Sequence, residues 1–356
     1  MKLDNEWSGI MNKTLHQYDP KDLSDYLVSH VPGFSRLKKI EKFSDGQSNP
    51  TYKVTDITGT NYVLRAKPPG QLLKSAHAVD REFRVMSALA NTEIPVPKML
   101  HLSGQETPLG TQFFVMEYLV GTVFWDPALP GHSNSFRQKT FAELVTILSK
   151  LHDLSPTTVG LEDYGKAGNY FERQVKRWST QYRASEMEHL SEMNWTIDWL
   201  NQNLVADDGQ VSIVHGDYRL DNVMFERGSS KIVAVLDWEL STLGHPFADL
   251  AYQCMGLRLP QTGMIKGLDG VDRQLVDIPS EAEYVAEYCS LRGINLPDNW
   301  SFYITFSFFR LAAILQGVLH RAHSGNASNP TEIDVMKSTI ITLARAAKAS
   351  AKEAEK

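Results

Sequence analysis

Residues that could carry out chemistry are concentrated in the stretch VHGDYRLDNVMF, residues 214–225. A short apolar run leads into it, and the following eight residues hold five polar side chains: His215, Asp217, Arg219, Asp221 and Asn222. A core element could bury this many polar groups only if they had partners. The stretch is therefore either a polar surface turn or a loop that positions reacting groups.

A second apolar run, residues 232–236, is followed at once by Asp237. If it pairs as a hairpin with the run at residues 211–214, Asp217, Asn222 and Asp237 would converge at one end. Carboxylate and amide oxygens are hard ligands that suit Mg²⁺. Asp217 and Asn222 also have the spacing of the kinase catalytic loop, where the aspartate receives a hydroxyl proton and the asparagine binds metal. The alternative is a plain turn, since Asp and Asn are common in turns.

Upstream, the segment FSDGQSNPTYKV, residues 43–54, could form a strand-turn-strand flap over phosphate groups. Its backbone N–H groups and the hydroxyl of Ser48 would be the donors. The flap has one glycine and departs from the G-x-G-x-x-G pattern. It therefore supports the interpretation of the loop at Asp217 but is a weak signal by itself.

A cation that could bind the same phosphates is expected on the next strand. Val63, Arg65 and Lys67 share one face of that strand, and Glu82 projects from the helix expected after it. A strand cation held by a helix carboxylate orients the nucleotide phosphates in kinases. We favour Arg65 over Lys67 because two prolines follow Lys67 and should end the strand. The alternative is that Arg65 and Glu82 are ordinary surface charges.

The elements that must hold these groups change in character along the chain. Asp19 and Pro20 predict a capped helix. Residues 37–65 contain short β-rich runs between turn signals, which predict an antiparallel meander. A helix is expected over residues 75–90, and the run FFVMEY, residues 113–118, predicts a further strand.

Beyond Gly121 the spacing of apolar residues is helical, and only the two strand-like runs at 211–214 and 232–236 interrupt it. The most apolar run, residues 302–319, is broken by polar side chains and is shorter than a membrane-spanning helix requires. It is expected to be a buried core helix, in which Arg310 is paired to a carboxylate rather than acting as a substrate ligand.

Composition limits the classes of protein that fit. The chain has 356 residues, of which 42% are hydrophobic and 22% charged, as in a globular protein. A net charge of −6 without a long Lys/Arg run argues against nucleic acid or membrane as a partner. Two isolated cysteines, Cys254 and Cys289, and an N-terminus without an apolar leader predict a cytoplasmic protein without a disulfide framework. Composition does not determine the oligomeric state.

The motifs VHGDYRLDN, VLDWE and HPFADLAY resemble those of the aminoglycoside phosphotransferase family, a small-molecule branch of the protein-kinase-like fold, over about residues 25–345. GQSNPTY, VLRAKPPG and SAHAVDREFRVMSAL are similar to the kinase-like domain fused to some acyl-CoA dehydrogenases and to its free-standing bacterial relatives. The resemblance implies an α+β, two-lobed kinase-like fold. Residues 1–118 would form an N-terminal extension and a small β-rich nucleotide-binding lobe, and residues 119–356 a large helical lobe for catalysis and acceptor binding.

Carried over residue by residue, the resemblance implies ATP and Mg²⁺ as cofactors and a phosphotransferase activity. Asp217 would be the catalytic base, and Asn222 and Asp237 would bind Mg²⁺. Arg65, held by Glu82, would orient the phosphates.

Further positions follow from the same resemblance. Ser48 would lie in the phosphate flap. The carbonyl of Glu117 and the N–H of Leu119 would bind adenine at the hinge between the lobes. His215 would brace the catalytic loop, and Asp249 would stabilise the loop after Asp237.

The resemblance implies a small-molecule hydroxyl as acceptor, with a 4-hydroxyacyl-CoA or a related hydroxy acid as the favoured class. Family members that act on polycationic aminoglycosides usually line the acceptor cleft with carboxylates, whereas the segment NYFERQVKRW offers cations here. Arg173 and Arg177 are one helical turn apart and could meet an anionic group, such as the phosphates of CoA. A solvated basic helix face is the alternative. An aminoglycoside or other small-alcohol kinase remains open as well.

Two other functions compete with this interpretation. A protein kinase is disfavoured because GHPFADLAY follows Asp237 almost at once and leaves no room for an activation segment. A nucleotide-binding pseudokinase is suggested by arginine at the position where kinases have lysine. The presence of Asp217 together with Asn222 and Asp237 argues against it, since a binding module needs no base.

Overall fold

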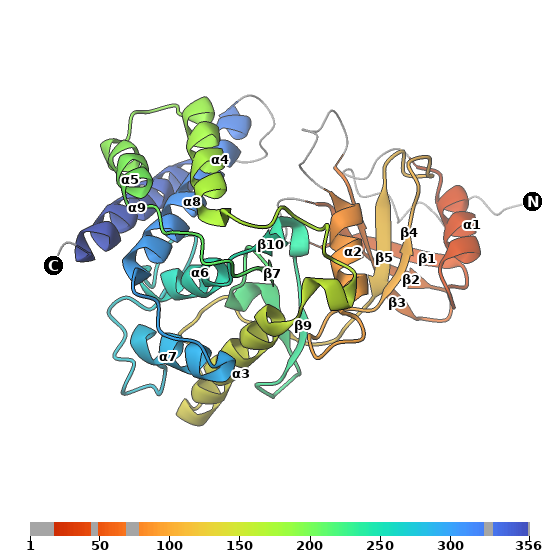
Figure 1. Ribbon diagram of the computed structural model, residues 1–356. Helices are drawn as coiled ribbons and strands as arrows, with labels where there is room; N and C mark the ends of the chain where they lie inside the picture. The colour runs from red at the N-terminus through yellow and green to blue at the C-terminus, as the bar shows by residue number, and fades with distance from the viewer. Residues whose placement is uncertain (1–17, 44–48, 69–77, 324–329, 355–356) are drawn as a thin grey trace, which may run out of the picture. The chain divides into compact units, whose positions relative to one another are not determined.

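The computed structural model describes residues 18–43, 49–68, 78–323 and 330–354. The chain forms two compact units, Met1–Gly121 with Val233–Glu239, and Thr122–Ile232 with Leu240–Lys356 (Figure 1). The first unit is built around a β-sheet and the second mainly from helices, which confirms the expected α+β class. The segment Val233–Glu239 brings Asp237 into the first unit.

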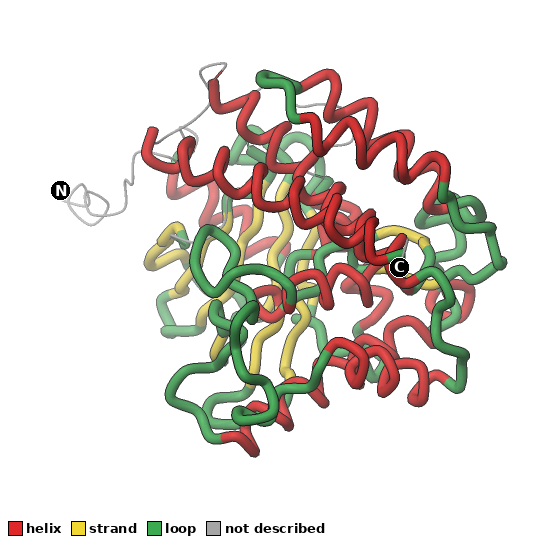
Figure 2. Tube along the Cα trace, turned by 90° about the vertical axis from the view of Figure 1, so that its left-hand side faces the viewer, coloured by secondary structure: helices red, strands yellow, loops and turns green. Residues whose placement is uncertain are grey.

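The first unit contains a five-stranded antiparallel sheet with the order β1-β2-β3-β5-β4. Figure 2 shows strands of this sheet side by side, in yellow. The elements of the unit are α1 (Pro20–His30), β1 (Leu37–Lys42), β2 (Thr51–Asp56), β3 (Asn61–Ala66), α2 (Val79–Leu89), β4 (Met99–Leu102) and β5 (Phe113–Glu117). The predicted first helix, meander, second helix and FFVMEY strand are therefore confirmed, and β4 had no strong signal in the sequence.

Helices α1 and α2 cover opposite faces of this sheet. Phe113 of β5 packs in a core cluster with Leu23 of α1, whereas the next residue, Phe114, lies 6.4 Å between ring centroids from Phe83 of α2. Neighbouring strand residues point to opposite faces. Arg65 pairs across the sheet with Phe114, so it lies on the α2 face.

The start of α1 is fixed by its cap. The Asp19 carboxylate accepts a hydrogen bond from the backbone N–H of Lys21 at 2.7 Å, and proline occupies the first helical position. The side chain thus satisfies one of the N–H groups that a helix start leaves without a partner. The capped helix predicted at Asp19 and Pro20 is confirmed.

The second unit is mainly helical. Its helices are α3 (Asn134–Asp153), α4 (Tyr170–Ser185), α5 (Ser191–Gln202), α6 (Phe247–Leu257), α7 (Glu281–Arg292), α8 (Trp300–Arg321) and α9 (Pro330–Glu353). Short strands lie between them: β6 (Thr122–Val123), β7 (Ser212–Val214), β8 (Val223–Phe225) and β10 (Thr242–Gly244), while β9 (Ile232–Val235) crosses the boundary between the units. Helix α8 packs against α4, α6 and α9, and α3 packs against α7 (Figure 1).

Helix α8 is the most apolar element. It is the one helix in the described parts of the chain that is long and apolar enough to cross a membrane, but 83% of its apolar window is buried inside the protein. This burial is what a core helix shows, as the sequence predicted for residues 302–319.

The predicted hairpin between the runs at 211–214 and 232–236 is wrong. Strand β7 pairs antiparallel with β10, with Val214 opposite Thr242, and β9 is not a member of that sheet. The sequence TLG of β10 is too short to give a period-two signal. Strands β6 and β8 were also not anticipated, for the same reason.

Candidate active site

A network of charged side chains surrounds Arg65 in the first unit. Its Nε lies 2.9 Å from Glu82 Oε2, and its Nη2 donates to Asp237 Oδ1 at 2.7 Å. Glu239 Oε2 lies 3.7 Å from the same nitrogen, and Thr51 accepts from Nη1 at 3.3 Å. One guanidinium therefore links strands β2 and β3, helix α2 and the segment after β9.

The contacts of Arg65 and Lys67 bear on which of the two would orient the phosphates. Lys67 Nζ lies 3.7 Å from Asp80 Oδ1, and Glu82 is held by Arg65 and by Asn49, whose amide donates to it at 2.8 Å. The preference for Arg65 is therefore consistent with the contacts. Ser48, the expected flap donor, lies outside the described residues.

Burial controls the ionisation of this network. Glu82 is 1% exposed. Burial raises the pKa of its carboxyl to about 7; the charge of Arg65 opposes the rise, and Asp237 and Glu239 reinforce it. Burial alone would lower the pKa of Arg65, but the surrounding carboxylates outweigh it and raise the pKa above the ordinary value. Arg65 thus stays charged, and the carboxyl of Glu82 takes up a proton more readily than an ordinary glutamate does.

Asp237 has a strained backbone. Its φ angle is +62°, in the left-handed region that non-glycine residues seldom adopt. Such strain persists only where the surroundings hold it, and it occurs often at functional sites. The hydrogen bond from Arg65 is one contact that holds it here.

The expected hinge residues lie at the end of β5. Glu117 is the last residue of that strand and pairs with Tyr62. Its carboxylate accepts from the backbone N–H of Lys98 at 2.7 Å. Leu119 follows two residues later and is half-buried. The Glu117 side chain thus forms a hydrogen bond within the first unit. Any contact of this residue with the adenine of a nucleotide would come from its backbone.

The second unit holds the loop that contains Asp217. Asn222 donates through Nδ2 both to the backbone carbonyl of Asp217 and to its Oδ2, each at 2.8 Å. Tyr252 on α6 lies near this carboxylate: burial raises the pKa of its hydroxyl well above the ordinary value, and the charge of Asp217 adds to the rise. The Asp217 side chain remains 20% exposed. The structure therefore brings Asp217 and Asn222 together and leaves the carboxylate reachable.

His215 and Asp249 brace this loop from behind. His215 Nδ1 accepts from the Asp217 N–H at 3.2 Å, as expected of a bracing residue. Asp249 Oδ2 accepts from the His215 N–H at 2.6 Å, and Oδ1 from the Gly216 N–H at 2.8 Å. The expectation that Asp249 stabilises the loop after Asp237 is therefore wrong: it holds the loop before Asp217. Fully buried, Asp249 also contacts His152 Nε2 at 3.3 Å.

Gly216 is required by the tight passage of the loop. Its φ is +83°, and a Cβ atom at this position would lie 2.5 Å from the Leu240 carbonyl oxygen. Any side chain would therefore push the loop away from the backbone beneath it. Glycine permits the left-handed conformation as well as the close approach.

Mg²⁺ is the ion that the family resemblance implies, and the donor types suit it. Because Asn222 uses its NH₂ group on Asp217, its carbonyl oxygen is the end left for a cation. Asp237 supplies a carboxylate, a hard oxygen donor like the amide oxygen. Among the described residues no group of three or more His, Cys, Asp or Glu side chains is arranged to hold a metal.

Arg173 and Arg177 of α4 do not act as a matched pair. Arg173 donates to the carbonyls of Lys166 and Ala167 and so fixes the chain before the helix. The Arg177 guanidinium lies over the Trp178 ring, 5.1 Å from its centroid. Arg177 is thus the better placed of the two for an anionic ligand.

Sequence reasoning missed Tyr252 and His152. Tyr252 lies in HPFADLAY, which resembles a motif of the family, but nothing in the spacing showed that this residue would lie near Asp217. His152 lies in the last turn of α3, and its Nδ1 lies 2.6 Å from the Tyr288 hydroxyl. Both contacts join residues far apart in the sequence, which local patterns do not reveal.

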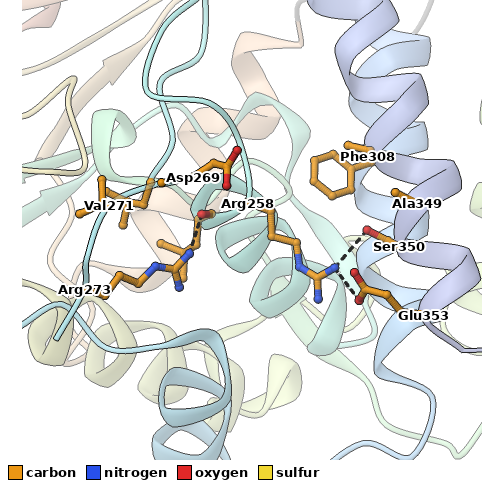
Figure 3. A pocket seen from close by; sticks show the side chains of 12 residues that line it. Arg258, Asp269, Val271, Arg273, Phe308, Ala349, Ser350 and Glu353 are labelled. Carbon is orange, nitrogen blue, oxygen red and sulfur yellow. Dashed lines mark hydrogen bonds and ion pairs between the residues drawn. The ribbon is translucent and has the colours of Figure 1, made fainter. Parts of the chain in front are cut away.

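A cavity of about 500 Å³ lies elsewhere in the second unit (Figure 3). Arg258 and Arg273 line it, together with apolar residues of α8 and α9. Arg258 pairs with both oxygens of Glu281 at 2.7 Å and with Glu353 at 2.9 Å. None of the candidate site residues lines this cavity, so we do not assign the chemistry to it.

The family comparison covers most of the chain. The model of the Phosphotransferase enzyme family matches residues 39–282. Among curated proteins, acyl-CoA dehydrogenase family member 10 from Mus musculus is 44% identical over 312 residues, which are 87% of this chain and 29% of that protein. The chain therefore spans less than a third of the length of this relative.

Solved structures agree with the family match. A protein from Ralstonia eutropha JMP134, provisionally assigned as an aminoglycoside phosphotransferase, is 42% identical with a TM-score of 0.84, over 95% of this chain and 99% of that one. A thermostable mutant of an aminoglycoside phosphotransferase in complex with AMP-PNP and hygromycin B has a TM-score of 0.58 at 13% identity, over 91% of this chain and 98% of that one. At that identity the likeness concerns the fold alone.

Proposed function

The chain belongs to the phosphotransferase enzyme family and is a small-molecule kinase, and on that premise we propose that it transfers the γ-phosphoryl group of ATP to a hydroxyl of a hydroxyacyl-CoA or a related hydroxy acid. The observation that carries this proposal is the loop at Asp217. Its carboxylate is held by Asn222 yet remains partly exposed. A held carboxylate within reach of a hydroxyl is what a phosphotransferase needs as a base.

In the proposed reaction the hydroxyl oxygen of the acceptor attacks the γ-phosphorus, the bond to the ADP oxygen breaks, and the hydroxyl proton passes to Asp217. Arg65, fixed by Glu82, would neutralise charge on the phosphates. Asn222 and Asp237 would hold Mg²⁺, which supplies charge neutralisation when bound. Positioning accounts for most of the catalysis in such reactions, and no phosphoenzyme is involved.

The remaining assignments belong to the same proposal. The Glu117 carbonyl and the Leu119 N–H would bind the adenine, and Ser48 would contribute a donor to the phosphate flap. Arg177, with Arg173 as a weaker candidate, would meet an anionic part of the acceptor. We also propose a cytoplasmic location, supported by two buried cysteines without a disulfide, Cys254 and Cys289.

The acceptor class is supported by the relatives. The curated relative is named as an acyl-CoA dehydrogenase family member, and the solved relative is assigned as an aminoglycoside phosphotransferase. The cations of α4 favour an acyl-CoA or hydroxy acid acceptor over an aminoglycoside. An aminoglycoside is itself a polycation, so these side chains would repel it. A protein kinase fits less well, since α6 begins at Phe247 and leaves little chain after Asp237 for an activation segment.

The proposal is tested by ATP consumption in the presence of Mg²⁺ with 4-hydroxyacyl-CoAs, free hydroxy acids, aminoglycosides and choline-like alcohols. We expect turnover with the hydroxyacyl compounds. Turnover of an aminoglycoside and of no hydroxyacyl compound would contradict the acceptor assignment. Binding of ATP without turnover of any acceptor would favour the pseudokinase instead.

A further inference from the structure

Arg310 of α8 is a buried arginine without a carboxylate partner. It is 4% exposed, and within the described part of the chain it forms no ion pair, which overturns the expectation that it pairs with a carboxylate. Its Nε has no hydrogen-bond partner. Its guanidinium carbon lies 5.8 Å from the centroid of Trp178 and 5.6 Å from that of Tyr252.

A charge in this position is unfavourable unless something compensates it. Arginine keeps its proton inside proteins, and a buried charge without a counter-charge destabilises the fold. Contacts with two aromatic faces offset only part of this. Arg258 shows the contacts that a structural arginine makes in this protein. Its nitrogens donate to Glu281, and also to Glu353 and Ser350 (Figure 3).

A second cation reinforces the excess of positive charge. Arg177 of α4 lies over the Trp178 ring, at 5.1 Å from its centroid, so the same ring contacts the guanidinium groups of both arginines. The residue is exposed overall, which places it at the rim while Arg310 lies inside. Partial burial and the charge of Arg310 both lower the pKa of Arg177.

The cluster lies beside the candidate base. The Asp217 carboxylate acts electrostatically on the hydroxyl of Tyr252, and the ring of the same tyrosine faces Arg310. Helices α4 and α6 both pack against α8 within the second unit. One tyrosine side chain therefore spans the space between the carboxylate proposed to accept a proton and an arginine that lacks an anion.

We propose that Arg310, assisted by Arg177, binds an anionic group of the acceptor substrate, so that the substrate is a hydroxy acid whose carboxylate lies only a few bonds from the hydroxyl that faces Asp217. This rests on the proposed function, which gives Asp217 its role. A guanidinium binds a carboxylate through two parallel hydrogen bonds, and binding would supply the missing counter-charge. In a CoA thioester the carboxyl is no longer charged, and the CoA phosphates lie many bonds further away.

The test compares three acceptors that share one hydroxyl: 4-hydroxypentanoate, its methyl ester and its CoA thioester. ATP consumption is measured for the wild type, Arg310→Met and Arg310→Lys. We expect the lowest KM for the free acid. Arg310→Met should raise that KM at least tenfold with a smaller change in kcat and little effect on the ester, and Arg310→Lys should lie between. An equal effect of Arg310→Met on all three acceptors would overturn the proposal.

A measurement without ATP separates this inference from the proposed function. 4-Hydroxypentanoate should raise the unfolding temperature of the wild type, because a ligand that binds only the folded state stabilises it. Arg310→Met should unfold at a higher temperature than the wild type without ligand and should not respond to the acid. The matched control Arg258→Met should unfold at a lower temperature and keep the response.

The outcomes are distinct. No ATP consumption with any of the three acceptors, together with a thermal response that Arg310→Met removes, would contradict the proposed function and support the anion site. A lower unfolding temperature of Arg310→Met together with an unchanged response to the acid would give Arg310 a structural role and refute the anion site.

Discussion

Arg65 holds Asp237 through a hydrogen bond of 2.7 Å between Nη2 and Oδ1. The same guanidinium contacts Glu82 on α2. The residue proposed to orient the phosphates thus also fixes the residue proposed to bind Mg²⁺, whose backbone is in a left-handed conformation. Loss of Arg65 should therefore affect two functions at once.

We expect Arg65→Met to raise the KM for ATP about tenfold or more and to lower kcat, because it removes a charge from the phosphates and releases Asp237. It should also lower the free energy of unfolding by about 1–3 kcal/mol, since Glu82 loses its buried partner. Steady-state kinetics and urea unfolding measure the two effects. Lys67→Met is the matched control and should change the kinetics and the stability little. Lys67 contacts Asp80 at 3.7 Å, and both of these side chains are more exposed than Arg65 and Glu82. A larger kinetic effect at Lys67 would transfer the phosphate role to it.

Asp217→Asn should lower kcat by about 10²–10⁴ while ATP binding stays nearly normal, because the amide cannot accept the hydroxyl proton. Single-turnover kinetics and nucleotide titration measure the two quantities. Asp221→Asn is a suitable control in the same loop, since Asp221 pairs with Arg219 at 2.8 Å and has no proposed chemical role. Near-normal turnover in Asp217→Asn would remove Asp217 from the role of base.

Gly216→Ala should destabilise the protein by about 3 kcal/mol or more and lower activity. The new methyl group would meet the Leu240 carbonyl at 2.5 Å in a left-handed conformation. Gly228→Ala is the matched control: its φ is +73°, but nothing lies within 4 Å of the new atom, so only about 1–2 kcal/mol of backbone strain should appear. Equal losses in the two variants would mean that the close approach at Leu240 does not restrict the loop.

The candidate site was predictable from sequence where its parts are close together in the chain or follow a regular order. Asp217 and Asn222 are five residues apart, and their contact follows from a local turn. Arg65 and Glu82 come from a strand and the helix after it, so their meeting follows from the order of elements. Neither required knowledge of the tertiary fold.

The contacts that could not be predicted join distant segments. Strand β7 has only three residues and could pair with either of two later runs, and the structure pairs it with β10. Asp249 was recognised as structural but assigned to the wrong loop, because a carboxylate shows nothing of its partners before the chain is folded. The missing counter-charge of Arg310 is likewise a property of three packed helices and not of any one segment.

The last prediction concerns the dependence of stability on pH through His152. Burial lowers the pKa of this imidazole below its ordinary value, and the contact with Asp249 offsets only part of the shift. The folded protein therefore binds fewer protons at this site than the unfolded chain does. The contribution of His152 is fully present above the unfolded pKa of about 6.5 and is lost progressively as pH falls toward the folded pKa.

We expect the difference in unfolding free energy between the wild type and His152→Gln to be largest near pH 8 and to shrink as pH falls below about 6.5. Urea unfolding at several pH values measures it. His189→Gln is the control, because that side chain is 76% exposed and should give a small difference at every pH. Because His152 contacts Asp249, which holds the backbone before Asp217, kcat of the variant should fall even where the protein remains folded. A difference that does not change with pH would mean that His152 titrates alike in the folded and unfolded chain.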